Sequence, residues 1–201
     1  MNIELDRVLC RQYPSLLWRR QVSNDDIFHF ECGDGWFDII HATLGVINKH
    51  SNLCDSPVLV TQIKEKFGLL RIYCSGGDEY TDAAISIAEL ISELVCEVCG
   101  GVGTVQITLG WSQVRCDIHK VISAENLNFP VQIYNNYSSS LTRTVDSVLG
   151  FFGPNPQWAL RWIKEPLAAL GHKKPYELLG TCEGCSAVGM LIDRLEHGVF
   201  T

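Results

Sequence analysis

The chain has 201 residues, of which 46% are hydrophobic, and a formal net charge of -7. This length suits one medium domain or two small ones, and no stretch approaches the ~18 consecutive apolar residues that a membrane-spanning helix needs. The acidic balance argues against a broad nucleic-acid surface, because phosphate binding depends on clustered lysine and arginine.

Residues 1–122 are predicted to form an α+β domain that contains a β-hairpin, helices and a zinc ribbon. The segment 5–20 is consistent with one or two short helices interrupted at Pro14. Segments 58–63 and 69–73 are rich in strand formers and flank a glycine-containing turn. This pattern predicts an antiparallel hairpin.

A glycine-rich turn, Gly33-Asp34-Gly35, precedes apolar residues that recur at helical spacing from Trp36 to Ile47. Asp34 is a candidate cap for that helix. A less favoured alternative is that the turn holds a ligand or metal together with His29, Cys32 or His41.

The amphipathic helix that starts at Asp78 runs directly into a set of metal-binding residue types. Two ligand pairs, each with two intervening residues, are separated by sixteen residues, close to the spacing of structural zinc ribbons. The predicted ligands are Cys96, Cys99, Cys116 and His119. Four protein ligands leave no open position for water, so we expect a structural zinc ion and no catalysis there. The alternative is two unrelated thiol pairs on a hairpin.

The predicted ribbon is a poor candidate for binding phosphates. Arg115 is its only basic side chain between the first and last ligands, against Glu97 and Asp117. We therefore interpret the zinc as a staple for a small domain.

Nine cysteines are spread from Cys10 to Cys185 with only two close pairs, which does not suit a disulfide framework. The second pair, Cys182 and Cys185, could be a redox motif, an extra metal half-site or two incidental cysteines, and the helical context favours the last. The first residues lack a secretory signal pattern. We expect a cytoplasmic protein.

Asparagine, proline and serine dominate residues 123–140, which we predict to be a linker. Residues 141–201 then form a small all-α domain. Its helices are expected to end before Pro154 and Pro166, and the last one to begin at a Thr181 cap and end at Gly198. Helical spacing predicts core packing for Phe152, Trp158 and Trp162, with a binding face as the alternative.

Three segments of this region, 151–163, 170–179 and 191–200, resemble in order the toxin-binding domain of Xre/MbcA/ParS antitoxins. Their most specific parts are the Ala-Leu-Arg-Trp helix, the Pro-x-Glu-Leu-Leu turn and the closing Arg-Leu-Glu-His-Gly-Val-Phe. The resemblance implies a protein that neutralises a toxin of the RES or a related NAD-consuming fold by obstructing its active site. The partner-binding residues it implies are Arg194, Glu196, Gly198, Val199 and Phe200.

The N-terminal part resembles a group of small phage and prophage proteins of unknown activity, through residues 30–40, 62–71, 75–78 and the zinc ligands. Two hypotheses follow. The first is a non-enzymatic antitoxin with a protein toxin as partner, possible self-association and no membrane attachment. The second is a phage or prophage adaptor that engages a host complex or nucleic acid through its zinc domain. The isolated chain is not expected to bind duplex DNA.

Overall fold

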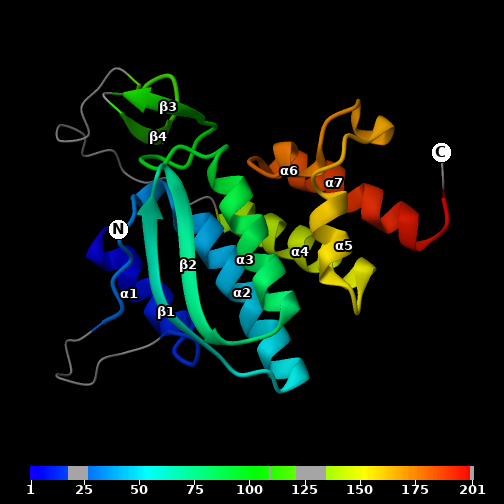
Figure 1. The fold of residues 1–201 in the computed structure, drawn as a ribbon, viewed down its shortest axis with the longest axis horizontal. Helices are drawn as coiled ribbons and strands as arrows, with labels where there is room; N and C mark the ends of the chain where they lie inside the picture. Colours follow the sequence, from blue (N-terminus) through cyan, green and yellow to red (C-terminus); the bar gives the residue numbers. More distant parts are fainter. Residues whose placement is uncertain (18–26, 109, 121–134, 200–201) are drawn as a thin grey trace.

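A computed structural model of the chain describes residues 1–17, 27–108, 110–120 and 135–199 (Figure 1). The helices are α1 (Ile3–Gln12), η1 (Asp34–Trp36), α2 (Phe37–Cys54), α3 (Glu79–Ser92), α4 (Asn135–Phe152), α5 (Pro156–Trp162), η3 (Ala168–Leu170), α6 (Pro175–Leu178) and α7 (Cys182–Glu196). The strands are β1 (Val58–Lys66), β2 (Leu69–Gly76), β3 (Thr104–Thr108) and β4 (Trp111–Arg115). No helix within the described ranges is long and apolar enough to cross a membrane.

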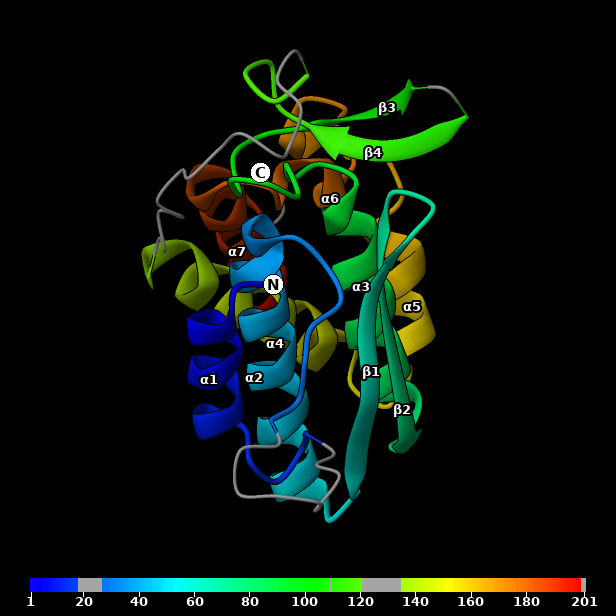
Figure 2. The ribbon, with the colours of Figure 1, turned by 90° about the vertical axis from the view of Figure 1, so that its left-hand side faces the viewer.

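The predicted α+β class is confirmed, because the structure combines helices with two separate antiparallel sheets, β1–β2 and β3–β4. The β1–β2 hairpin turns at Phe67 and Gly68, whose φ angles of 56° and 78° suit the right-handed twist of paired strands. Its inner face buries Ile63, Leu70 and Ile72. This face lies along α3 in both ribbon views (Figures 1 and 2).

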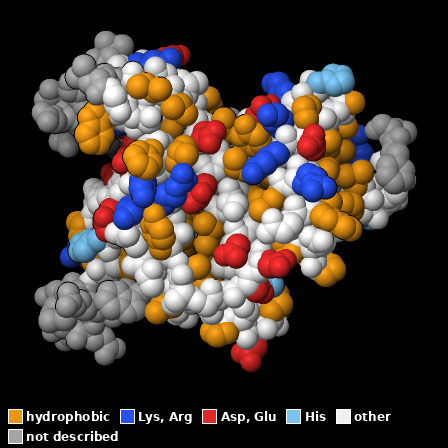
Figure 3. All heavy atoms as spheres, viewed as in Figure 1, with side chains coloured by type: hydrophobic (Ala, Val, Ile, Leu, Met, Phe, Trp, Pro, Cys, Tyr) orange, Lys and Arg blue, Asp and Glu red, His pale blue; other side chains and the backbone are white. Residues whose placement is uncertain are grey.

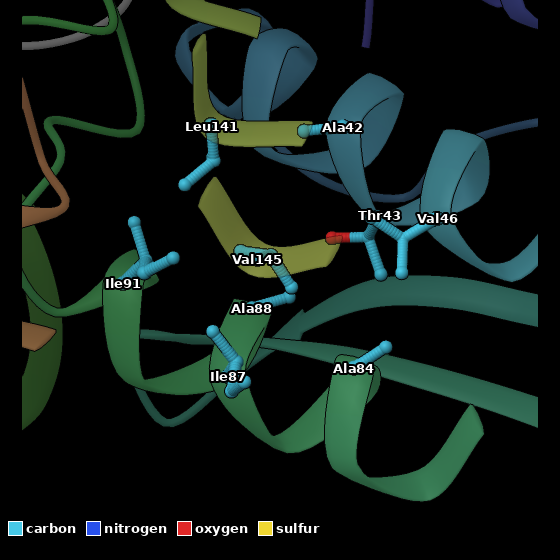
Figure 4. Close-up of a pocket in the computed structure, with 9 residues that line it drawn as sticks. All are labelled: Ala42, Thr43, Val46, Ala84, Ile87, Ala88, Ile91, Leu141 and Val145. Carbon is cyan, nitrogen blue, oxygen red and sulfur yellow. The ribbon is translucent and has the colours of Figure 1, made fainter. Parts of the chain in front are cut away.

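The core of the protein is built where α2, α3 and α4 meet. Aliphatic and small side chains of the three helices point toward a common gap of about 10 Å³ (Figure 4). A gap of this size is at the lower limit for one water molecule, and an apolar lining keeps such a space dry. Its lining residues are Ala42, Thr43, Val46, Ala84, Ile87, Ala88, Ile91, Leu141 and Val145.

The C-terminal helices pack onto this same core. Helix α4 contacts both α2 and α3, and α5 contacts α3. The hydroxyl of Tyr137 donates to the carbonyl of Leu179 at 2.8 Å, which joins α4 to the segment before α7. Helix α4 begins at Asn135, inside the segment 123–140 for which we expected a linker. Residues 121–134 of that segment lie outside the described residues.

Candidate metal centre and partner-binding region

The four predicted ligands lie together. Cys96, Cys99, Cys116 and His119 each offer one ligand atom, and these atoms all lie within 4.8 Å of one another. Cys96 and His119 are buried, whereas the other two are half-buried. The cluster follows α3 and is completed after β4, so the β3–β4 hairpin is the excursion between the two pairs.

The distances between these atoms fit a tetrahedral ion. Zinc–sulfur bonds of about 2.3 Å place two sulfurs roughly 3.8 Å apart, and a sulfur and a nitrogen roughly 3.6 Å apart. The Sγ atoms of Cys99 and Cys116 are separated by 3.8 Å. The Nδ1 atom of His119 lies 3.5 Å from Cys96 Sγ and 3.1 Å from Cys116 Sγ. This cluster could therefore hold a metal ion.

Each ligand pair sits on the same kind of backbone turn. The N–H of Gly100 donates to the carbonyl of Cys96 at 2.9 Å, and the N–H of Lys120 donates to that of Cys116 at 3.0 Å. Gly100 has a φ of 79°, which favours glycine. The two turns thus aim both residues of a pair at one point.

Burial shifts the ionisation of two of the four candidate ligands. Burial raises the pKa of the Cys99 thiol to about 12, so without a cation its thiolate is costly. Burial, aided by the charge of Arg115, lowers the pKa of His119. A neutral imidazole is the form that binds metals.

The Gly33-Asp34-Gly35-Trp36 turn packs directly against the first ligand turn, a role that we did not predict. A Cβ atom on Gly35 would lie 2.2 Å from the carbonyl oxygen of Cys96, and one on Gly33 would lie 2.2 Å from that of Glu97. The N–H of Gly35 donates to Glu97 O at 2.9 Å. The Trp36 indole donates to Val95 O, also at 2.9 Å. Glycine is therefore required here for close approach.

Asp34 does not cap the following helix, contrary to our expectation. One 3-10 turn separates it from α2, which begins at Phe37 without a side-chain cap. The Asp34 carboxylate instead accepts a hydrogen bond from the N–H of Asn2 at 2.6 Å.

The alternative metal site at this turn is not formed. Within the described residues, the cluster of Cys96 and its three partners is the only group that could hold an ion. His29 faces Asp6 at 3.1 Å, and His41 faces Gln12 at 3.0 Å.

An ion pair reinforces the ligand turn. Glu97 and Arg115 meet at 2.8 Å with only 15% and 11% of their side chains exposed. The only arginine of the ribbon is therefore neutralised by a neighbouring acid, which weakens any attraction for phosphates.

The last helix begins as predicted. The side chain of Thr181 accepts from the N–H of Gly184 at 3.1 Å and caps α7. Gly198 follows the helix with a φ of 69°. Arg194, Glu196, Gly198 and Val199 are exposed at this end of α7, and Phe200 lies outside the described residues.

The second cysteine pair lies in the first turn of α7. Cys185 is buried, and its thiol donates to the carbonyl of Leu179 at 3.6 Å. Burial raises the pKa of both thiols, that of Cys185 to about 12. A redox pair at a helix start needs the opposite shift.

The three aromatic residues of this region divide into two groups. Phe152 and Trp162 pack together with ring centroids 5.8 Å apart, as expected. Trp158 is 59% exposed, and our prediction of core packing for it is wrong. Helix α5 is only seven residues long and buries Pro156 and Ala159 instead.

Helices α4 and α7 also enclose a shallow groove of about 200 Å³ with polar and apolar walls. Exposed side chains of α7, including Met190 and Asp193, form one side. Arg143 of α4 lies on the other.

Comparison with known proteins matches the C-terminal part of the chain. Residues 148–198 match the family described as the antitoxin Xre/MbcA/ParS C-terminal toxin-binding domain. The antitoxin Xre of Yersinia enterocolitica is 42% identical over 59 residues, which are 29% of this chain and 40% of that protein. The antitoxin Xre of Photorhabdus laumondii is 35% identical over 57 residues, 28% of this chain and 38% of that protein.

The Prs ADP-ribosylating antitoxin of a Sphingobium species is 38% identical over 45 residues, 22% of this chain and 28% of that protein. The chain thus spans less than half the length of each of these relatives. No solved structure matches the chain. The segment from the end of α4 through α7 is therefore similar to the toxin-binding domain of Xre/MbcA/ParS antitoxins.

Proposed function

We propose that this protein is an antitoxin-like inhibitor that binds and neutralises a protein toxin through its C-terminal helices. The observation that carries the proposal is the family match over residues 148–198, which covers the end of α4 and all of α5 to α7. The proposed role is binding and not catalysis.

The contact region that we propose is the exposed end of α7. Arg194 and Glu196 would make charged contacts at the rim of the toxin's cleft, and Val199, which is 47% exposed, would add apolar contact with Phe200 beyond it. Gly198 follows α7 with a left-handed backbone, the conformation that commonly terminates a helix.

The class of toxin that we propose is one of the RES or a related NAD-consuming fold. The resemblance of the C-terminal segments supports this class.

We propose zinc as the metal, in a structural role. Three thiolates and one imidazole at tetrahedral separations are a ligand set that zinc prefers. The closed set would hold together the β3–β4 hairpin, the end of α3 and the Gly33–Trp36 turn. This function requires no exchangeable position on the ion.

The decisive test is co-expression with the toxin encoded by the neighbouring reading frame. A chain that lacks residues 198–201 should fail to neutralise the toxin while keeping its thermal stability and zinc, because these residues do not belong to the described core. Replacing exposed Lys173 with alanine serves as a control that leaves the tail intact. Full neutralisation by a stable truncated protein would refute the proposed contact.

One observation favours the adaptor as a second function. The β3–β4 ribbon exposes large apolar side chains. Ile107 is 76% exposed and Trp111 is 75% exposed. Figure 3 shows apolar side chains over this ribbon and lysine and arginine on the adjoining β1–β2 hairpin. If the adaptor hypothesis holds, the double variant Ile107→Ser and Trp111→Ser should abolish capture of a host protein. If the adaptor hypothesis does not hold, the double variant should leave toxin neutralisation unchanged.

A further inference from the structure

A cysteine, a histidine and an aspartate lie in hydrogen-bonding order at the end of α2, apart from the metal centre. The Sγ atom of Cys54 lies 3.6 Å from Nδ1 of His50, one helical turn earlier. Nε2 of the same imidazole lies 2.7 Å from Oδ2 of Asp78, the residue that precedes α3. Thiol, imidazole and carboxylate in this order are the arrangement of a nucleophile, its base and the group that orients the base.

The carboxylate is held in its ionised form. Burial opposes the ionisation of Asp78, but hydrogen bonds from His50 and from the N–H of Thr81 outweigh it and lower the pKa of the carboxyl. Its second oxygen accepts from the N–H groups of Tyr80 and Thr81 at 3.1 Å each. An ionised carboxylate at Nε2 favours a proton on that nitrogen, which leaves Nδ1 of His50 as the acceptor for the thiol.

The plane of the imidazole is fixed by a second set of contacts. The ring of Tyr80 stacks on that of His50 with centroids 3.9 Å apart and planes 9° apart. The Tyr80 hydroxyl donates to Asp146 of α4 at 3.1 Å, and the Lys49 ammonium contacts the other oxygen of Asp146 at 2.6 Å. With Asp78 and Cys54, these charged and titratable groups lie around the imidazole.

Cys54 is the accessible thiol of this protein. All nine cysteines lie in the described residues, and Cys54 alone among them is exposed. The His50 side chain is only 15% exposed, so the base is shielded while the nucleophile faces solvent. Burial raises the pKa of Cys32, Cys74 and Cys182, which makes these thiols poorer competitors.

We infer that Cys54 is a modification site that undergoes thiol–disulfide exchange with small-molecule disulfides, with His50 as its base. The proton of the thiol moves to Nδ1 of His50, and the thiolate attacks one sulfur of the disulfide. A new S–S bond forms on Cys54 as the original S–S bond breaks. The departing sulfur takes the electron pair and then the proton from the imidazolium, so the product is a mixed disulfide and a free small thiol.

The expected size of the effect follows from thiol chemistry. A thiol with an ordinary pKa near 8.5 is only ~3% ionised at pH 7, so complete activation raises the thiolate population about 30-fold. A more acidic thiolate is a weaker nucleophile, which reduces the gain to as little as about threefold. Loss of the base should therefore slow the exchange by roughly three- to thirtyfold at pH 7 and by little at high pH, where the thiol ionises unaided.

The test treats the full-length, metal-loaded protein with glutathione disulfide and follows each cysteine by peptide mass spectrometry across a range of pH. Cys54 should be modified first, and His50→Ala should slow it at pH 7 but not above the ordinary thiol pKa. Asp78→Asn keeps a good helix cap and removes the charge, so it should also slow the exchange. His172→Asn is the matched control at an exposed, left-handed histidine that asparagine tolerates, and it should leave the rate unchanged.

Circular dichroism on each variant separates loss of activation from loss of fold. Modification of Cys54 no faster than that of half-buried Cys182 in the unaltered protein would overturn the inference. Equal rates at pH 7 for the unaltered protein and for folded His50→Ala and Asp78→Asn would overturn it as well.

Discussion

Substitution of Gly35 by alanine should break the support of the metal centre. The added Cβ atom would lie 2.2 Å from Cys96 O, 2.5 Å from Gly100 N and 2.8 Å from Cys99 N, all of them backbone atoms of the ligand turn. A carbon and an oxygen in contact normally stay about 3.3 Å or more apart, so the two turns must separate by about 1 Å. No side-chain rotation can relieve this contact.

The cost has two parts. Overpacking in a close-packed region typically costs about 1–3 kcal/mol. Separation also weakens the bond from the Gly35 N–H to Glu97 O and the bond from Trp36 Nε1 to Val95 O, each worth about 1 kcal/mol. The sum is about 3–5 kcal/mol. For a chain of this size it lowers the melting temperature by roughly 10 °C.

The assays are thermal unfolding and the rate of zinc release to a colorimetric chelator. Gly150→Ala is the matched control, because an added Cβ atom there meets nothing within 4 Å on helix α4; it should raise stability by about 0.5–1 kcal/mol through helix propensity. Unchanged melting and zinc release in Gly35→Ala would refute the argument that close approach requires this glycine.

Three further predictions follow from the centre and the core. Cys99→Ser should remove stoichiometric zinc, as measured by elemental analysis. It should also lower the melting temperature, because a closed site contributes several kcal/mol to folding. A Cys99→Ser protein that lacks zinc but is as stable as the unaltered protein would contradict the structural role. Leu141 lines the cavity between α2, α3 and α4. Leu141→Ala should lower the free energy of unfolding in denaturant by about 2–5 kcal/mol and shift a single transition of the whole chain. A shift confined to a separate C-terminal transition would contradict the shared core. Burial lowers the pKa of His41. Its neutral form therefore stabilises the fold above the unfolded pKa near 6.5, and that stability is lost as the pH falls through the folded pKa. His41→Gln should flatten the fall in stability below about pH 6.5, and an unchanged pH profile would contradict this role of His41.

The elements that the sequence predicted well are those with local signals. The β1–β2 hairpin follows from strand formers on both sides of Phe67-Gly68, and the cap of α7 from Thr181. The candidate metal ligands were identifiable because two pairs of ligand residue types, each with two intervening residues, are separated by a spacing close to that of zinc ribbons. These signals depend on residues close together in the chain.

The features that the sequence did not reveal depend on contacts between distant segments. The glycines at 33 and 35 gave the local signal of a turn, but their closest neighbours are Glu97 and Cys96, more than 60 residues away in the chain. Trp158 has the spacing of a core residue and nevertheless faces solvent, because periodicity does not show which side of a short helix is covered. The early start of α4 at Asn135 was missed because asparagine and serine are weak helix formers. Tyr137, in its first turn, is buried and bonds to the distant Leu179, which the local sequence does not show.

The continuous packing of α4 onto α2 and α3 has a thermodynamic consequence for the proposed binding of a toxin. If the metal centre and α7 unfold as one cooperative unit, only the folded fraction can bind a partner, and the apparent dissociation constant is the intrinsic one divided by that fraction. Removal of the metal would then lower the affinity for a partner bound at α7, although no residue in contact with the partner has changed. A bound partner would in turn hold the ion more tightly, because linkage between two ligands of one folded state is reciprocal.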